Sequence, residues 1–517
     1  MVINIHREGL LLAPTMNSLI AARTEAEAGG HRVEFIAVAD KIDAETSRVL
    51  KEFHPVFDQV HHVTFGDLGA SRAFGIKNAS ADWVFMHDAD DLFSSNWYRV
   101  FLDLLAKGQV DQNTVYHTDI FARFGVEIDA RKMIDSADPR FHPLMQASEW
   151  YFSNKAVFHR SLLDRFPMPK NDIRKGIGNE DWTWASHTTA AGIRHSPLPR
   201  TICFYRTKAA ALSLGLTPGM IHDRSDLYAP DSIIKLAVQR TVKGSKIPGF
   251  APHLVGRADP VIGEGPLQDW FWDEVQQQGA FESQITEFNA RRTQIRCFLP
   301  RLHYNVVSAV EYLMKDMDTR PKIFIFASAE NIRGADNVID LFLRAAARYK
   351  SETYQPVLVL DEGQLVPSEL RILASFGAKL ISVEHFRRYY KIEDWYFSRL
   401  MLRPLVQYKG SIIVNLCSDT FTQLFTEFHR VLIENFKPLV HICLDPVFDL
   451  LSPSLSNILT NAIHHSLHTK LAMPVFGYPA QVGRLLCNAR LHPSDLPAQT
   501  IAALQAVTVE RYRAPDK

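Results

Sequence analysis

Short apolar runs alternate with helix-like segments over about the first 230 residues. The runs that we interpret as strands are 2–5, 33–39, 61–65 and 83–86, and the segments that we interpret as helices are 15–27 and 71–79. The strand runs are short and apolar on both faces, which is typical of parallel strands covered by helices. The pattern therefore predicts an α/β unit over residues 1–230, whose ligands would bind beyond the carboxyl ends of the strands.

The pattern changes twice after this unit. Strand signals fade over residues 231–318, where we expect a helical connector that packs, because the aromatic residues 270–272 need burial. A second helix of the connector is predicted over 304–314. Near Pro321 the alternation resumes, with predicted strands at 322–327, 356–360, 412–415 and 440–444 and a helix from Gly334 to Tyr349. Residues 319–517 therefore predict a second, Rossmann-like α/β domain.

Composition excludes several function classes. The chain has 517 residues, with 57 Lys and Arg against 57 Asp and Glu. Because no net charge attracts a polyanion, we expect no nucleic-acid partner and at most a peripheral association with membranes. The first residues lack the pattern of a signal peptide, which predicts a cytoplasmic protein, with the inner face of the membrane as an alternative place. The five cysteines form no C-x-x-C pair and are expected to be reduced and buried.

An acidic cluster follows the apolar run at residues 83–87. Asp88, Asp90 and Asp91 lie within four residues at the predicted end of a strand. Crowded carboxylates are costly unless a cation or hydrogen-bond donors compensate them. Oxygen ligands of this kind suit Mg²⁺ or Mn²⁺. The alternative is that Asp90 and Asp91 only cap a helix that begins near Leu92.

Residues 69–79 and 83–91 together resemble family-2 glycosyltransferases, which have the GT-A fold. In that family a helix with an A-R-N-x-G pattern precedes a strand that ends in D-x-D-D. Arg72 and Gly75 match this pattern, and Ala73 stands where the family has Asn. The resemblance implies a nucleotide-diphosphate sugar donor, a divalent metal held by Asp88 and Asp90, and a donor contact from Arg72. In this reading Asp88 contacts the ribose or the metal, and Asp90 holds the metal that bridges the diphosphate.

Three further segments extend the resemblance to the donor site. Asp40 ends the second predicted strand, where the family has an Asp that recognises the nucleotide base. His6 and Glu8 stand in the loop that is the family's first nucleotide contact, although its customary Pro is missing. Arg206 lies in an element, 204–213, that resembles the family's Y-R-x-K-x-x-S-L-S, where a cation offsets diphosphate charge. His222 is the nearest candidate for the family's metal-binding histidine, and a surface histidine is the alternative.

Glu180 and Asp181 begin a predicted helix that ends at Gly192. The amino end of a helix stabilises carboxylates and keeps a base ionised. The segment resembles the family's E-D motif, in which the Asp removes the proton from the acceptor hydroxyl, so the resemblance makes Asp181 the base and Glu180 its catalytic neighbour. The alternative is that both are ordinary first-turn acids beside a core residue, Trp182.

The second α/β domain has a fainter resemblance. Residues 324–327 and 332–338 resemble the first strand and glycine-rich turn of the amino-terminal half of GT-B glycosyltransferases, as in two-transferase fusions of bacterial polysaccharide synthesis. Only about 200 residues remain there, which is the size of one domain. The domain is therefore either a truncated second transferase or a non-catalytic acceptor or partner module.

Together these features predict a metal-dependent inverting glycosyltransferase. Its acceptor would be a glycan or lipid-linked glycan of a bacterial surface polysaccharide, such as an O-antigen, capsule or exopolysaccharide, with other polysaccharide-assembly proteins as partners. One alternative is a non-catalytic carbohydrate-binding or assembly module. Another is a sugar nucleotidyltransferase, which needs a glycine- and lysine-rich loop near the first strand, whereas residues 4–12 offer only Arg7 and Gly9.

Overall fold

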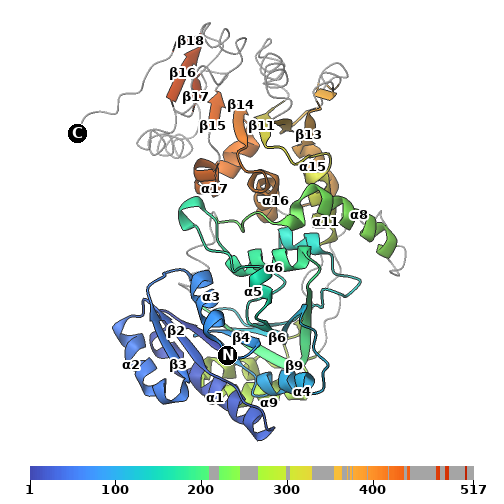
Figure 1. Cartoon of the computed structure of the whole chain (residues 1–517). Helices are drawn as coiled ribbons and strands as arrows, with labels where there is room; N and C mark the ends of the chain where they lie inside the picture. The colour runs from blue at the N-terminus through green and yellow to red at the C-terminus, as the bar shows by residue number, and fades with distance from the viewer. Residues whose placement is uncertain are drawn as a thin grey trace, which may run out of the picture.

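A computed structural model gives the arrangement of two β-sheets with helices between and around them (Figure 1). It describes residues 1–208, 220–244, 266–298, 303–328, 354–363, 370, 373–374, 377–392, 394–416, 418–435, 439–442, 473–477, 484–487 and 507–508. The sheet of the N-terminal unit lies at the bottom of Figure 1, and the second sheet lies at the top.

The first sheet has a parallel part and an antiparallel extension. The parallel strands are β1 (Val2–Ile5), β2 (Ile36–Asp40), β3 (Gln59–Val63) and β4 (Trp83–Asp88), in the order β3-β2-β1-β4. The sheet continues through β8 (Ala156–His159), β6 (Thr114–Gly125), β7 (Asp129–Lys132) and β10 (Cys297–Phe298). The long β9 (Arg194–Thr207) pairs with β6 and with β5 (Leu92–Phe93). Asp40 and Asp88, the last residues of β2 and β4, therefore lie at the same end of the sheet.

Helices cover this sheet. They are α1 (Leu12–Ala28), α2 (Ala44–Phe53), α3 (Leu68–Asn78), α4 (Trp97–Ala106), α5 (Leu162–Arg165) and α6 (Glu180–Ala190). Helix α3 packs on β1 and β2, and Gly75 makes this possible because a Cβ there would collide with the side chains of Val2 and Val38. Helix α2 was not predicted, although its N-cap Asp43 accepts a hydrogen bond from the amide of Thr46 and so carries a recognisable start signal.

The connector packs against the first sheet, as its aromatic residues predicted. Its helices are α8 (Pro230–Gly244), α9 (Asp269–Gly279), α10 (Glu287–Ala290) and α11 (Tyr304–Met314). Phe271 and Phe288 are buried together with Phe204 of β9. The connector also supplies β10, which the sequence pattern did not predict. The boundaries at residues 230 and 318 stay a prediction.

The second sheet is parallel through its first five strands. These are β13 (Lys379–Ser382), β12 (Gln355–Leu360), β11 (Lys322–Ala327), β14 (Ile412–Leu416) and β15 (Leu439–Ile442). The antiparallel strands β17 (Arg484–Cys487), β16 (Met473–Gly477) and β18 (Val507–Thr508) complete it. The described helices beside it are α15 (Val383–Tyr390), α16 (Asp394–Gln407) and α17 (Asp419–Asn435).

The α/β character predicted for residues 319–517 is confirmed by these strands. The helix predicted from Gly334 to Tyr349 and the turn at 332–338 lie outside the described residues, so the GT-B resemblance stays a prediction. Cys203 is buried and Cys297 is half-buried, and both are free thiols.

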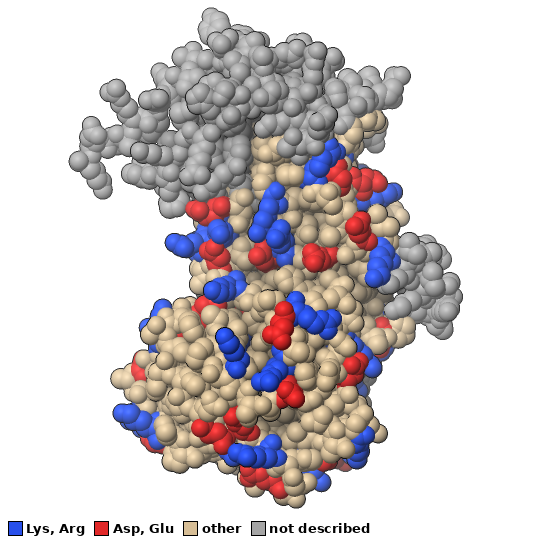
Figure 2. Space-filling model, viewed as in Figure 1, with Lys and Arg blue, Asp and Glu red and all other residues tan. Residues whose placement is uncertain are grey.

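The surface and the helices bear on possible partners. Among the described residues, no helix is both long and apolar enough to cross a membrane. Figure 2 shows basic and acidic side chains interspersed over the described part of one face. This mixture agrees with the balanced composition of the chain.

Candidate functional site

Arg72 joins two acidic segments that are distant in the sequence. Its guanidinium donates to both carboxylate oxygens of Asp88, at 2.8 and 3.2 Å, and also to Glu180. The Arg72 side chain is only 3% exposed, and Asp88 and Glu180 hold its pKa above the ordinary value. Through Arg72, helix α3 therefore connects the end of β4 with the first turn of α6.

Lys155 is a second buried cation at the same place, and the sequence analysis did not identify it. Its ammonium group lies 2.7 Å from Asp88 and 3.2 Å from Asp91, and 4.8 Å from the ring centre of Tyr205. Despite the cost of burial, Arg72 and Lys155 hold the pKa of Asp88 well below its usual range. The only sequence cue for Lys155 is its position directly before the buried strand β8.

Asp181 lies in the first turn of α6, behind the N-cap Asn179, whose φ is +56°. Burial and the neighbouring charge of Glu180 raise the pKa of Asp181 to about 6, against the opposing charges of Arg72 and Lys155. Glu180 is fully engaged: one oxygen accepts from Arg72 and the other from the side-chain amide of Asn171 at 2.8 Å. Both oxygens of Glu180 are therefore engaged by protein donors, and the catalytic roles of Glu180 and Asp181 stay predictions.

Asp90 is the more open of the two predicted metal ligands. Its side chain is 25% exposed, and its partner is the ammonium of Lys208 at 2.6 Å. Glu8, from the loop after β1, lies near enough for the charge of Asp90 to raise its pKa, although burial is the larger cause of the shift to about 7. Burial also raises the pKa of Asp91 to about 7.

Arg206 is occupied by protein partners. Its Nε donates to the backbone oxygen of Asp90 at 3.0 Å, and its terminal nitrogens donate to Gln284 at 3.1 Å and Glu282 at 2.5 Å. Its own amide donates to Asp91 at 2.9 Å. These bonds fix the turn after β4 against the connector. Lys208, two residues further on, is the cation of this segment with an accessible head group, since its side chain is 32% exposed.

Asp40 and His6 make hydrogen bonds that hold together the loops at the end of the sheet where the nucleotide is predicted to bind. The Asp40 carboxylate accepts from the amide of Gly66, at 2.8 and 3.0 Å, and from the hydroxyl of Ser71 at 2.9 Å. The His6 ring bonds to the backbone oxygen of Asp40, and the amide of His6 donates to Glu8 at 2.6 Å. Loops after three neighbouring strands are thereby held together. A contact of Asp40 with a nucleotide base stays a prediction.

His222 is not a surface residue. Its side chain is buried, stacks on Trp182 with ring centres 4.9 Å apart, and lies 3.3 Å from the hydroxyl of Tyr228. Burial lowers its pKa well below the ordinary value. The alternative of a surface histidine was wrong because the segment 220–228 folds under α6, which the sequence pattern could not indicate.

The carboxylates at the end of β4 were predicted to hold a divalent ion. Among the described residues, no group of three or more His, Cys, Asp or Glu side chains is arranged to hold a metal. A Mg²⁺ ion needs fewer protein ligands when substrate phosphates and water complete its shell. The carboxylate of Asp90 faces one cation, Lys208, whereas the oxygens of Asp88 already face both Arg72 and Lys155.

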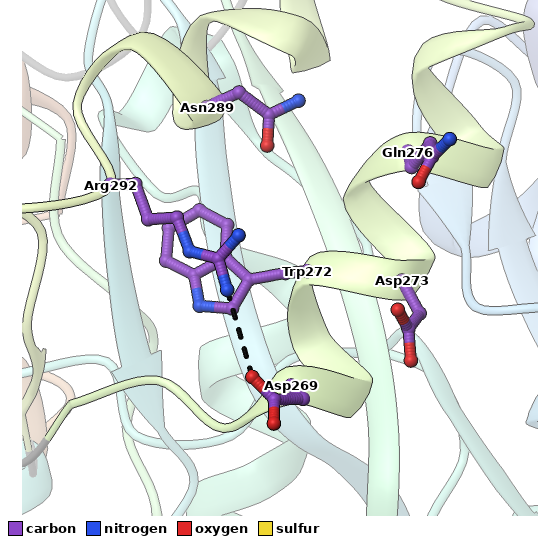
Figure 3. Close-up of a pocket in the computed structure, with 6 residues that line it drawn as sticks. All are labelled: Asp269, Trp272, Asp273, Gln276, Asn289 and Arg292. Atoms are coloured by element: carbon purple, nitrogen blue, oxygen red, sulfur yellow. Dashed lines mark ion pairs between the residues drawn. The ribbon is translucent and has the colours of Figure 1, made fainter.

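A separate cavity lies on the connector. Its volume is ≈ 210 Å³. Figure 3 shows its lining residues on α9, on α10 and on the segment after α10. The guanidinium of Arg292 covers the indole ring of Trp272 at 4.8 Å and lies 3.6 Å from Asp269. Asp273, Gln276 and Asn289 complete the lining. None of the catalytic, donor-binding or metal-binding residues predicted from the sequence lines this cavity. The cavity is therefore not part of the candidate functional site.

Comparison with known proteins identifies the N-terminal part. The family model described as Glycosyl transferase family 2 matches residues 1–166, about a third of the chain. Over these residues the match confirms the resemblance to family-2 glycosyltransferases that the motifs indicated, and the α/β fold of the N-terminal unit is GT-A-like. A search of curated proteins found no match.

Similar solved structures include TarS of S. aureus. The crystal structure of TarS 1-349 is 14% identical, with a TM-score of 0.29, and the alignment covers 60% of this chain and 90% of that chain. The same protein in complex with UDP-GlcNAc is 13% identical, with a TM-score of 0.30 and the same coverage. TarS itself is 14% identical over 62% of this chain and 55% of that chain, with a TM-score of 0.27. These TM-scores are too low to establish a common arrangement.

Proposed function

We propose that this chain, whose N-terminal unit is a family-2 glycosyltransferase domain, transfers a sugar from a nucleotide-diphosphate donor to a glycan hydroxyl with inversion at the anomeric carbon. The observation that carries the proposal is the position of Arg72. It bonds at once to Asp88, at the end of β4, and to Glu180, directly before Asp181. A donor-side acidic cluster and an acceptor-side base are therefore adjacent, although more than 90 positions separate them in the chain.

Asp181 is the proposed general base. It takes the proton from the acceptor hydroxyl while that oxygen attacks the anomeric carbon of the donor. The bond from this carbon to the diphosphate oxygen breaks, and the nucleoside diphosphate leaves with the electron pair. A pKa near 6 suits the task, because the carboxylate is ionised at neutral pH and is a stronger base than an ordinary Asp.

A divalent metal would neutralise the charge that develops on the departing diphosphate. We assign its binding to Asp90, with Asp88 beside it. Arg72 and Lys155 hold the Asp88 carboxylate in one orientation, whereas Asp90 faces only the partly exposed ammonium of Lys208. Lys208 is the side chain that an incoming ion or diphosphate would displace from Asp90.

The donor nucleotide is proposed to lie at the edge formed by the loops after β1, β2 and β3. His6, Glu8 and Asp40 order this edge, and Arg72 closes it toward α6. Arg206 stabilises this edge through its hydrogen bond to Glu282. We assign the contact with the leaving diphosphate to Lys208, whose head group is more accessible than that of Arg206. The acceptor is proposed to be a glycan or lipid-linked glycan of a bacterial surface polysaccharide, made at the cytoplasmic face of the membrane.

A panel of nucleotide sugars tests the proposal. UDP-glucose, UDP-N-acetylglucosamine, UDP-galactose and GDP-mannose are each incubated with the full chain and Mn²⁺, and the released nucleoside diphosphate is measured. We expect release from at least one donor, its loss on chelation with EDTA, and its loss in Asp181→Asn. Binding of these donors without release in the presence of varied glycans would contradict the proposal and favour the non-catalytic module. Formation of pyrophosphate from a nucleoside triphosphate and a sugar phosphate would favour the nucleotidyltransferase.

A further inference from the structure

Arg403 belongs to α16 of the second α/β unit, but its hydrogen-bond partners belong to the N-terminal region. Its terminal nitrogens donate to the backbone oxygens of His222, at 2.7 Å, and Asp223, at 3.1 Å. The residue is 1% exposed, and its guanidinium lies 5.1 Å from the ring centre of Tyr228. Burying a guanidinium is costly, so its two backbone acceptors must be held in place for the arrangement to persist.

The segment that Arg403 holds is bonded in turn to the helix that carries the proposed base. The amide of Gly178 donates to Ile221 at 3.1 Å, and the amide of Ile221 donates to Gly176 at 3.0 Å. These bonds form a short parallel pairing directly before α6. The amide of Asp223 donates to the hydroxyl of Thr183 at 3.2 Å, inside the first turns of α6. The segment 220–223 therefore fixes the loop before α6 and the helix itself.

Two more contacts from the second unit reach the same loops. Asn435, at the end of α17, donates to the backbone oxygen of Lys175 at 2.9 Å. Gln407, at the end of α16, accepts from the amide of Ser225 at 3.2 Å. Figure 1 shows α17 above the loop that leads to α6, and α17 packs on residues 173–175 of that loop. Both chain segments that flank the start of α6 are thus supported from the second α/β unit.

We propose that Arg403 is a positioning residue for transfer, which fixes Asp181 through the segment 220–223, so that the second α/β unit is a working part of the acceptor side of the site. The proposal rests on Asp181 being the base. Arg403 itself contacts no proposed substrate position. Loss of its side chain leaves the carbonyl groups of His222 and Asp223, of which the first is buried, without this donor and releases the segment behind α6. A displacement of a catalytic group by about 1 Å can cost about 100-fold in rate.

The test compares Arg403→Met and Arg403→Lys with a matched control, Arg388→Met. Arg388 lies on α15 of the same unit, and its side chain is 81% exposed. Hydrogen–deuterium exchange of the full chain is measured for peptides that cover residues 172–186 and 220–228, with peptides of β1–β4 as an internal reference. Nucleotide release is measured with UDP-glucose, UDP-N-acetylglucosamine and GDP-mannose in the presence of Mn²⁺.

We expect Arg403→Met to raise exchange in 172–186 and 220–228 while exchange in β1–β4 stays at the wild-type level. With the donor that wild type cleaves, kcat should fall at least tenfold and the donor KM should stay within about twofold. Arg403→Lys should retain an intermediate kcat, and Arg388→Met should match wild type.

Two outcomes overturn the proposal. One is unchanged exchange in 172–186 in Arg403→Met. The other is an equal rise in exchange throughout both units, which would mean a purely structural role. If wild type releases no nucleotide from any donor, the proposed function fails, while the exchange measurement still decides whether Arg403 fixes α6.

Discussion

The ammonium group of Lys155 lies 2.7 Å from the carboxylate of Asp88, inside the protein, at the point where β4 ends. The side chain of Lys155 is 7% exposed and also reaches Asp91 at 3.2 Å. One protein cation therefore links two members of an acidic cluster that the sequence alone presents as a set of metal ligands. Arg72 and Lys155 both face Asp88, whereas Asp90 faces a single, partly exposed cation, Lys208.

Lys155→Met should destabilise the protein by about 3 kcal/mol, because removing one partner of a buried ion pair leaves charge without compensation. The free energy of unfolding, measured by urea denaturation, checks this value. Adding Asp91→Asn to Lys155→Met removes one of the two stranded carboxylates and should recover part of the loss. If the two changes are strictly additive, the direct interaction between Lys155 and Asp91 is contradicted.

Asp181 should set the acidic limit of activity. Its pKa of about 6 means that the base becomes protonated as the pH falls through 6. We expect kcat/KM for nucleotide release to fall about tenfold per pH unit below pH 6 and to be flat just above pH 7. Asp181→Asn should lower kcat by about 100-fold or more at every pH and remove this limit. A profile of wild type that stays flat down to pH 5 would exclude Asp181 as the base.

Asp90→Asn should abolish metal-dependent turnover with little change in stability. The carboxylate is partly exposed and sits among other acidic groups, so its loss relieves repulsion. Circular dichroism should give a melting temperature equal to or above that of wild type, and calorimetry should give weaker Mn²⁺ binding. Lys208→Met is the control: it removes the cation that faces Asp90 and should leave Mn²⁺ affinity equal or stronger. Wild-type turnover in Asp90→Asn would refute its assigned role.

A buried histidine pair should make folding sensitive to acid. His117 and His195 are buried, with ring nitrogens 2.9 Å apart, and His195 also lies 2.9 Å from the hydroxyl of Thr188 on α6. Burial lowers the pKa of His117 to about 3 and that of His195 well below its ordinary value. Above pH 6.5 both rings are neutral in the folded and unfolded chains. Below pH 6.5 only the unfolded chain takes up protons, so stability falls as the pH decreases toward 3.

The expected loss from His117 is about 2 kcal/mol at pH 5, relative to pH 7.5. His117→Gln should reduce the change in unfolding free energy between pH 7.5 and 5 by this amount. His54→Gln alters an exposed histidine and should leave the slope unchanged. Identical slopes in wild type and His117→Gln would contradict the assignment of a depressed pKa to His117.

The local pattern of the sequence predicted much of the first sheet. Apolar runs placed β1 and β4 correctly and placed β2 and β3 within a few residues, and the glycine in α3 fits its close packing on β1. Helix α2 was missed although Asp43 and Thr46 carry its start signal. These features depend on residues a few positions apart in the sequence, because the side-chain pattern of a strand or helix repeats every two to four residues.

The partners of the charged residues could not be predicted in the same way. The place of Arg206 at the diphosphate stays a prediction, but its partner Glu282 comes from the connector, which no motif indicated. His222 was weighed as a surface or metal-binding residue, but it lies buried on Trp182. Lys155 has no motif, and Arg403 comes from the other α/β unit. Each pairing joins elements far apart in the chain.

The sequence by itself determined which acidic residues end β2 and β4 and begin α6, since strand and helix ends follow from local periodicity. Only the tertiary structure decided which cations face them, because that depends on how β8, the connector and α16 close around the sheet edge. A charge that is buried away from water needs a partner of opposite charge or a hydrogen-bonding group. The element that packs nearest to the buried charge supplies that partner.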